Sequence, residues 1–332
     1  MARILAIRLG ALGDVAISMP SLYSFAKQYP QHQLYFVTRK AFVSLFEDAP
    51  NNLQVIGIDL KQYDGLRGLH RFYKEYIKPL HIDAVADMHN VMRSWVLNTH
   101  LWMSGARIAR RKKDKKERLQ LLRKKNKNYV QLRPYYQRFA DVFESLGYPI
   151  RLEFDGLNIA SPLICNGEKW IGIAPFSAHQ GKVYPLEKMQ EVIAMLDKLP
   201  QVKLLCFGGG KAEAEVFSNW EKQFNNLTSL AGKYSLQQEL GIMKQLSVML
   251  SMDSANMHLA SLVNTPVVSI WGPSHPYVGF CPWGQDPNNA VQVDLPCRPC
   301  SEWGAKPCSR GDWACMNMID PKVIVQKIKS FL

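Results

Sequence analysis

A carboxylate stands directly after the first predicted strand of the chain. In the segment RLGALGDV the strand ends at Leu9, Gly10 and Gly13 permit a tight turn, and Asp14 opens the following helix. An aspartate at this position can cap the helix by accepting hydrogen bonds from first-turn N–H groups; alternatively, its carboxylate can act as a catalytic base. The glycines do not match G-x-G-x-x-G, so the segment is not a dinucleotide-binding fingerprint.

A helix N-terminus in the second half of the chain is suited to bind phosphate. In SMDSANMHLA a strand ends at Met252 and a helix begins near Ser254, which exposes N–H groups together with the positive end of the helix dipole. Asp253 could equally be a helix cap, and His258 a satisfied helix residue. Upstream, the loop PFSAHQGK carries Lys182, whose ammonium would offset the charge of a diphosphate without a metal. A single lysine in a loop is, however, usually exposed to solvent.

Four of the seven cysteines fall within nineteen residues, at Cys297, Cys300, Cys308 and Cys315. A C-x2-C pair followed by two further cysteines can close a tetrahedral zinc site, but this spacing lacks the second C-x2-C of a zinc ribbon. Disulfides are disfavoured in a reducing cytoplasm, so four packed thiols are the alternative to a structural zinc ion. The pattern leaves both interpretations open.

Apolar runs alternate with segments of helical period along most of the chain. In the first half, strands are predicted at 4–9, 34–37, 55–58 and 84–86, and helices at 15–28, 41–46, 66–77 and 91–103. The rhythm restarts with strands at 170–174, 203–207, 248–251 and 267–270 and helices at 186–199, 212–224, 236–245 and 255–263. Such alternation favours parallel sheets covered on both faces.

The chain is too long for one ordinary core. It has 332 residues, whereas single cores stop growing beyond ~250 to 300 residues. We therefore expect an N-terminal Rossmann-like domain over 1–155 and a second over 156–318, followed by an amphipathic helix within 319–332 that packs back on the N-terminal domain. Ligands of open parallel sheets bind beyond the carboxyl ends of the strands, where both candidate sites lie.

The positive charge is concentrated in one segment. The net charge is +13, and between Arg107 and Lys127 twelve Lys or Arg face only Asp114 and Glu117. Such a run is commonly a solvated, mobile face. It could instead bind phosphorylated headgroups or anionic lipid, where each cation near the surface gains ~1 kcal/mol.

Neither a leader nor a membrane span is predicted. Arg8 and Asp14 interrupt the apolar core that a secretory signal would need. The longest stretch without charged residues, 254–285, contains four prolines, which break it well short of a spanning helix. We expect a cytoplasmic protein.

Taken in order, these motifs resemble the ADP-heptose lipopolysaccharide heptosyltransferases, glycosyltransferase family 9. The likeness spans nearly the whole chain and is carried by RLGALGDVAISMPSL, DAVADMHNVMRS, APFSAHQGKVYPLEKM, LLCFGGGKAEAE, LAGKYSLQQEL and SMDSANMHLASLVNTPVVSIWGPSHP. The resemblance implies an α/β protein of the GT-B fold, with two Rossmann-like, doubly wound parallel-sheet domains facing each other across a cleft. The cysteine-rich end resembles a terminal pattern found in some members.

The resemblance also implies roles for single residues. Asp14 matches the family's catalytic carboxylate and Lys182 a catalytic lysine at the diphosphate, in an inverting, metal-independent transfer that needs no cofactor besides the ADP-heptose donor. Asn90 and Arg93 match a motif near the acceptor. The donor-binding residues would be Gly13, Ser177, Glu213, Asp253, Ser254, Ala255, Asn256, Met257 and His258. Glu215 is the alternative to Glu213 at the ribose.

Three departures from the family pattern bear on specificity. Ala255 stands where Gly is common, Tyr184 replaces the usual Trp, and His89-Asn90 replaces the usual Gln-Gly. A related transferase that uses another nucleotide sugar for O-antigen or capsule is therefore the nearest alternative. A nucleic-acid-binding protein using residues 107–128 is a rival from another class, but the segment lacks aromatic interleaving and any known motif. We expect a monomer that contacts a lipid-linked phosphorylated saccharide and, transiently, the inner membrane, and that binds no nucleic acid.

Overall fold

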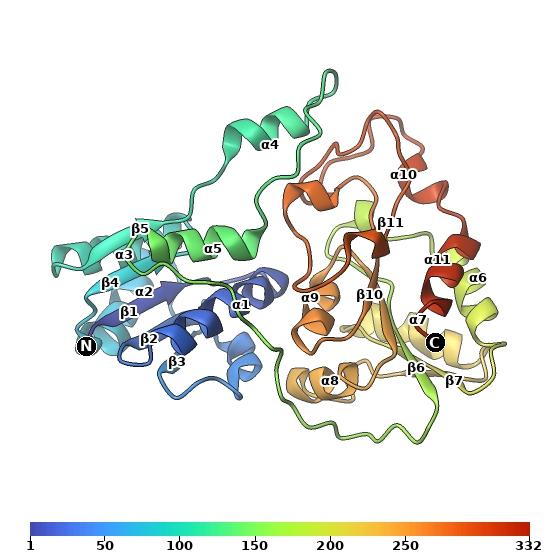
Figure 1. The fold of residues 1–332 in the computed structure, drawn as a ribbon, viewed down its shortest axis with the longest axis horizontal. Coiled ribbons are helices and arrows are strands. Elements are labelled where there is room, and N and C mark those ends of the chain that lie inside the picture. Colours follow the sequence, from blue (N-terminus) through green and yellow to red (C-terminus); the bar gives the residue numbers. More distant parts are fainter. The chain divides into compact units, whose positions relative to one another are not determined.

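A five-stranded parallel sheet forms the centre of the first of two units in the computed structural model, which describes residues 1–332 (Figure 1). This unit comprises Met1–Lys113 and Arg133–Asp155. Its strand order is β3-β2-β1-β4-β5. The strands are β1 (Arg3–Ile7), β2 (Gln33–Arg39), β3 (Leu53–Ile58), β4 (Ala84–Asp87) and β5 (Arg107–Arg110). The order reverses at β1, as in doubly wound folds, so the turn after β1 lies at the point where such folds bind ligands.

Helices cover the sheet of the first unit because its strands are apolar on both faces. On one face, Leu5, Ile7 and Val85 pack with the helices α2 and α3. The remaining long helices, α1 and α5, pack on each other, and the rings of Phe25 and Phe143 stack at 4.5 Å. The helix bounds are α1 (Leu12–Gln28), α2 (Gly65–Phe72), α3 (Met92–Met103) and α5 (Tyr135–Glu144).

The second unit contains a six-stranded parallel sheet and comprises Asp114–Leu132 and Gly156–Leu332. Its strand order is β11-β10-β9-β6-β7-β8. The strands are β6 (Lys169–Ala174), β7 (Val202–Cys206), β8 (Leu227–Ser229), β9 (Val248–Met252), β10 (Val267–Ile270) and β11 (Ala290–Val291). The helices are α4 (Lys115–Leu121), α6 (Leu186–Leu196), α7 (Lys211–Glu221), α8 (Leu236–Met243), α9 (Ala255–Leu262), α10 (Ala314–Asn317) and α11 (Pro321–Lys329).

Short helical segments complete both units. They are the 3-10 segments Lys40–Phe46, Lys78–Leu80, Gln180–Lys182, Pro276–Val278 and Pro287–Asn289, and the π-helical turn Tyr73–Ile77. The helix predicted at 41–46 is thus a 3-10 segment. None of the helices combines the length and the apolar composition needed to cross a bilayer.

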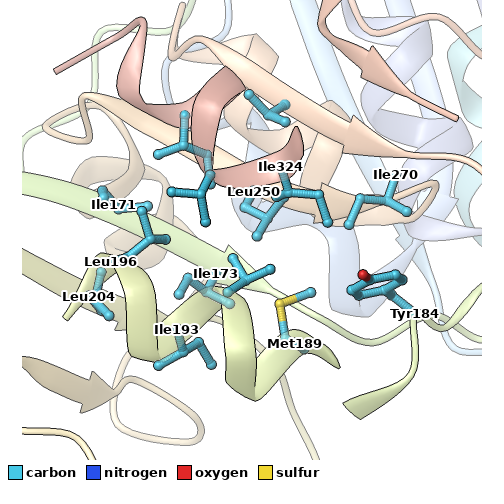
Figure 2. Close-up of a cluster of buried hydrophobic side chains, with 14 of the residues drawn as sticks. Ile171, Ile173, Tyr184, Met189, Ile193, Leu196, Leu204, Leu250, Ile270 and Ile324 are labelled. Atoms are coloured by element: carbon cyan, nitrogen blue, oxygen red, sulfur yellow. The ribbon is translucent and has the colours of Figure 1, made fainter. Parts of the chain in front are cut away.

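The C-terminal helix belongs to the core of the second unit. Figure 2 shows Ile324 of α11 among side chains of the central strands and of α6. Val325 and Ile328 lie in the same cluster, and α11 contacts α6 and β10. The prediction that this helix packs on the N-terminal domain is therefore wrong: its apolar face covers the second sheet beside α6.

The basic segment is more ordered than the solvated, mobile face that its charge suggested. It begins in β5, continues into α4, and from Asp114 to Leu132 forms part of the second unit. Arg118 pairs with the buried Glu302 at 3.1 Å, Lys127 Nζ donates to the Pro299 carbonyl at 2.7 Å, and the Leu132 N–H donates to a carbonyl at 2.9 Å. Three anchors on one surface hold a segment that its charge alone would leave mobile.

Candidate active site

Asp14 lies in the first turn of α1, where its carboxylate contacts both the helix N-terminus and an arginine. Its Oδ2 accepts the Ala11 N–H at 3.0 Å, which caps the helix, and the same oxygen pairs with Arg8 Nη2 at 2.5 Å. The side chain is 22% exposed. Because both contacts go to Oδ2, Oδ1 is left to accept a proton from a ligand. Gly13, within the same helix turn, is half-buried.

His89 packs beside Asp14 in its neutral form. Its Nδ1 accepts the Leu9 N–H at 3.3 Å. Burial lowers the pKa of His89 to about 3, with a further contribution from the Arg8 guanidinium. The ring therefore adds no charge to the site near neutral pH.

The two residues predicted near the acceptor differ in how they are held. Asn90 adopts φ +54°, and its N–H and its side-chain amide are bonded: the N–H donates to Asp87, Nδ2 donates to the Arg111 carbonyl at 2.9 Å, and Oδ1 accepts from Trp95 Nε1 at 2.7 Å. These bonds shape the turn between β4 and α3. Arg93 is exposed in the first turn of α3. Arg93 is therefore accessible to a ligand, whereas the side chain of Asn90 is held in hydrogen bonds within the protein.

Lys182 is buried and paired, contrary to the exposed position usual for a loop lysine. Its Nζ lies 2.7 Å from Asp253 Oδ2, and the two side chains are 9% and 5% exposed. Ser274 Oγ donates to the same carboxylate oxygen at 2.5 Å. Ser177 Oγ donates to the Asp253 carbonyl at 3.4 Å. Three segments that follow β6, β9 and β10 thus converge on one carboxylate.

The N-terminus of α9 is placed next to this pair. Ser254 is the N-cap in an extended conformation, and no side chain caps the helix. Ala255 and Asn256 are half-buried, whereas Met257 and His258 are buried. A helix start with uncapped N–H groups beside a buried ammonium can hold an anion such as a diphosphate.

Glu213 lies in a cavity together with Ser177. The cavity has a volume of about 410 Å³ and is walled by Phe176, Gly181 and Trp313 among others. Glu213 Oε2 accepts the Gly209 N–H at 2.8 Å, whereas Glu215 is exposed. A small-molecule pocket commonly has this size and a mostly apolar wall with few polar groups.

The four C-terminal cysteines are free thiols around a narrow space. They line a cavity of only about 10 Å³, and no group of three or more His, Cys, Asp or Glu side chains is arranged to hold a metal ion. Burial raises the pKa of Cys315 to about 11. The four thiols therefore gather around one space, and the choice between packed thiols and a structural zinc ion stays a prediction.

Sequence reasoning missed several residues of these sites. Ser274 lies in the same resemblance segment as Asp253, but nothing in that segment indicates that the two side chains bond, and Trp313 lies in the separate cysteine-rich end. Arg8 is in the first motif, but an arginine directly after a strand does not by itself indicate that it pairs with Asp14. Arg298 donates to the carbonyls of Trp271 and Ser274 at 3.2 and 3.1 Å, which fixes the segment that carries Ser274.

Comparison with solved structures identifies the fold. The match to a family 9 glycosyltransferase from Veillonella parvula covers 99% of this chain and 97% of that one, with a TM-score of 0.76 at 20% identity. It also matches the Escherichia coli heptosyltransferase WaaC solved with ADP, over 99% of this chain and 100% of that one, with a TM-score of 0.67 at 16% identity. The two parallel-sheet units therefore form a GT-B fold.

The family follows from the sequence. Residues 73–309 match the model of glycosyltransferase family 9 (heptosyltransferase), and the chain belongs to this family. A lipooligosaccharide heptosyltransferase 2 from Campylobacter jejuni is 24% identical over 96% of this chain and 95% of its own length. The protein is thus a glycosyltransferase.

Proposed function

We propose that the protein transfers a heptose from ADP-heptose to the inner core of lipopolysaccharide, with inversion and without a metal. The observation that carries this proposal is the buried Lys182–Asp253 pair beside the uncapped start of α9, in a member of the heptosyltransferase family. The Campylobacter relative is named for heptose transfer to lipooligosaccharide, and the WaaC structure contains ADP.

The proposed reaction is a single displacement. Oδ1 of Asp14 takes the proton of the acceptor hydroxyl while that oxygen attacks the anomeric carbon on the face opposite the diphosphate. The bond from the anomeric carbon to the diphosphate oxygen breaks through an oxocarbenium-like transition state. Lys182 and the α9 N–H groups stabilise the charge that develops on the leaving ADP. Attack from the opposite face inverts the anomeric configuration.

The distribution of residues supports separate roles for the two units. Lys182, Asp253, Glu213 and the α9 start lie in the second unit, which would bind the donor through residues 156–318. Asp14 and Arg93 lie in the first unit, where residues 1–155 would receive the acceptor. The cavity shared by Ser177 and Glu213 would hold the nucleoside, with Glu213 as the ribose contact.

The first experiment measures release of nucleoside diphosphate from a panel of nucleotide sugars, with a lipopolysaccharide core that lacks heptose as acceptor. Wild type is compared with Asp14→Asn and with Asp64→Asn, an exposed aspartate of the same unit. We expect wild type and Asp64→Asn to turn over ADP-heptose at similar rates. Asp14→Asn should reduce this turnover by about 10³-fold or more. Turnover of another donor would favour the O-antigen or capsule alternative, and a fully active Asp14→Asn would refute the proposed base.

We also propose that the basic segment brings this cytoplasmic enzyme to the anionic surface of the inner membrane. Its outward cations include Lys115, Lys116, Arg123, Lys124 and Lys125, all exposed. Each is expected to gain ~1 kcal/mol at an anionic leaflet. Replacing these five with glutamine should lower binding to phosphatidylglycerol vesicles by at least about tenfold.

A matched variant controls for net charge. It carries glutamine at five exposed lysines elsewhere, Lys169, Lys198, Lys222, Lys322 and Lys329. Equal losses in the two variants would show that net charge, rather than the basic segment, attracts the vesicles.

A further inference from the structure

Two buried guanidinium groups share one acceptor atom next to Asp14. Arg8 Nη1 and Arg111 Nε both donate to the Met88 carbonyl, at 3.2 and 3.3 Å. Arg8 is 6% and Arg111 8% exposed. Like charges placed this close in a protein interior repel each other and lose hydration. A fold that holds them there needs a compensating negative charge.

A third guanidinium lies at the rim of the same site. A Cβ on Gly10 would stand 3.2 Å from Arg39 Nε, so the Gly10 backbone passes directly against this exposed side chain. We call Arg8, Arg39 and Arg111 the arginine cluster. The lack of a side chain at Gly10 is what lets Arg39 approach the turn that leads to Asp14.

The carboxylates of the first unit do not balance this cluster. Asp14 pairs with Arg8, while Arg111 donates only to the carbonyls of Met88 and Lys112 and lies over the Tyr135 ring. The nearby carboxylate of Asp87 accepts two hydrogen bonds from the turn after β4 and two from side chains of α3, and it pairs with none of the three guanidinium groups.

Two neighbouring groups are consistent with an excess of positive charge at the cluster. Arg8 Nε is buried without a hydrogen-bond partner. The pKa of His89 is held down first by burial and then by Arg8, with Arg111 and Arg39 adding to this effect and only Asp14 opposing it. Of the three guanidinium groups, only Arg8 has a carboxylate partner.

We propose that the arginine cluster binds an anionic group, a carboxylate or a phosphate, on the acceptor saccharide, next to the hydroxyl that Asp14 deprotonates. The proposal rests on the proposed function for the identity of the acceptor. Guanidinium groups suit either anion because their forked donors match two oxygens at once. Binding there would hold the attacking hydroxyl at Oδ1 of Asp14, so the site selects acceptors whose acidic group neighbours the reacting position.

The test measures acceptor binding by calorimetry in the absence of donor, so it does not depend on turnover. The probe is the lipid-free core oligosaccharide of a lipopolysaccharide that lacks heptose, in three forms: intact, carboxyl-reduced and dephosphorylated. The variants are Arg111→Gln and Arg39→Gln, with Arg67→Gln, exposed on α2, as the matched control. Arg39 is exposed, so its variant remains informative if Arg111→Gln fails to fold.

We expect Arg111→Gln to weaken binding of the intact oligosaccharide by about thirtyfold, Arg39→Gln to weaken it less, and Arg67→Gln to leave it unchanged. If the recognised anion is a carboxylate, the carboxyl-reduced form should bind weakly, and equally weakly, to wild type and to Arg111→Gln. If it is a phosphate, the dephosphorylated form should behave in this way. Equal weakening of all three forms by Arg111→Gln, or no weakening of the intact form by either cluster variant, would overturn the proposal. Failure of heptose transfer with this dependence intact would count against the proposed function alone.

Discussion

Replacing Lys182 with methionine should destabilise the second unit by leaving the Asp253 carboxylate buried without its cation. The two side chains are 9% and 5% exposed and 2.7 Å apart, and removal of one partner from a buried pair costs about 3 to 5 kcal/mol. Asp253→Asn should cost a similar amount because it strands the ammonium. The double variant, which buries no charge, should recover most of this loss.

The assay is urea unfolding of the four proteins that complete this double-variant cycle, with Lys198→Met, an exposed lysine of the same unit, as the control. Titration of ADP against thermal unfolding adds a functional measurement, because Lys182→Met should lose most of the stabilisation that ADP gives wild type. The reasoning is refuted if Lys182→Met unfolds at the same urea concentration as Lys198→Met, or if the double variant is less stable than both single variants.

Three further substitutions test other contacts. Burial raises the pKa of Glu239 to about 7, so the folded protein keeps a proton that the unfolded chain loses, and wild type loses stability as pH rises from about 4.5 through 7. This loss amounts to roughly 3 kcal/mol. Glu239→Gln should remove it, as measured by urea midpoints at pH 5 and pH 8. Gly304→Ala should lower stability and donor affinity, because φ is +70° and the new Cβ would stand 2.6 Å from Lys182 Cγ, whereas Gly209→Ala, with open space around it, should not change stability to the same extent. Arg298→Lys should cost about 2 to 4 kcal/mol in thermal or urea unfolding, since one ammonium cannot replace a guanidinium that donates to several carbonyls; retention of wild-type stability would mean that these bonds contribute little.

The sequence predicted the parallel sheets well because their strands are apolar runs bounded by glycine or polar turns. Three strands escaped prediction. The strands β8 and β11 have only three and two residues, which carry no period, and β5, RIAR, is hidden by the arginines of the basic segment. The helix 319–332 was predicted correctly as an amphipathic element. The surface on which this helix packs was predicted incorrectly, because an apolar face shows that a helix is buried but not which surface covers it.

The candidate sites divide in the same way. Motif order identified Asp14, Lys182 and the start of α9 as candidates, but local spacing suggested an exposed Lys182. The lysine is buried because the Gly304 loop packs against its stem, a contact between residues far apart in the chain. The arginine cluster likewise joins three strand ends, and only the folded sheet brings them together.

The segment Asp114–Leu132 also sets where the polypeptide can be cut. The chain leaves the first unit after Lys113, returns at Arg133 and leaves again after Asp155, so neither unit is a continuous stretch of gene. A fragment ending at Asp155 would carry α4 without the surface that anchors it and would expose the otherwise buried Leu121 and Leu132. A chimaera that exchanges C-terminal halves between relatives should therefore transplant this insert together with the half that holds it.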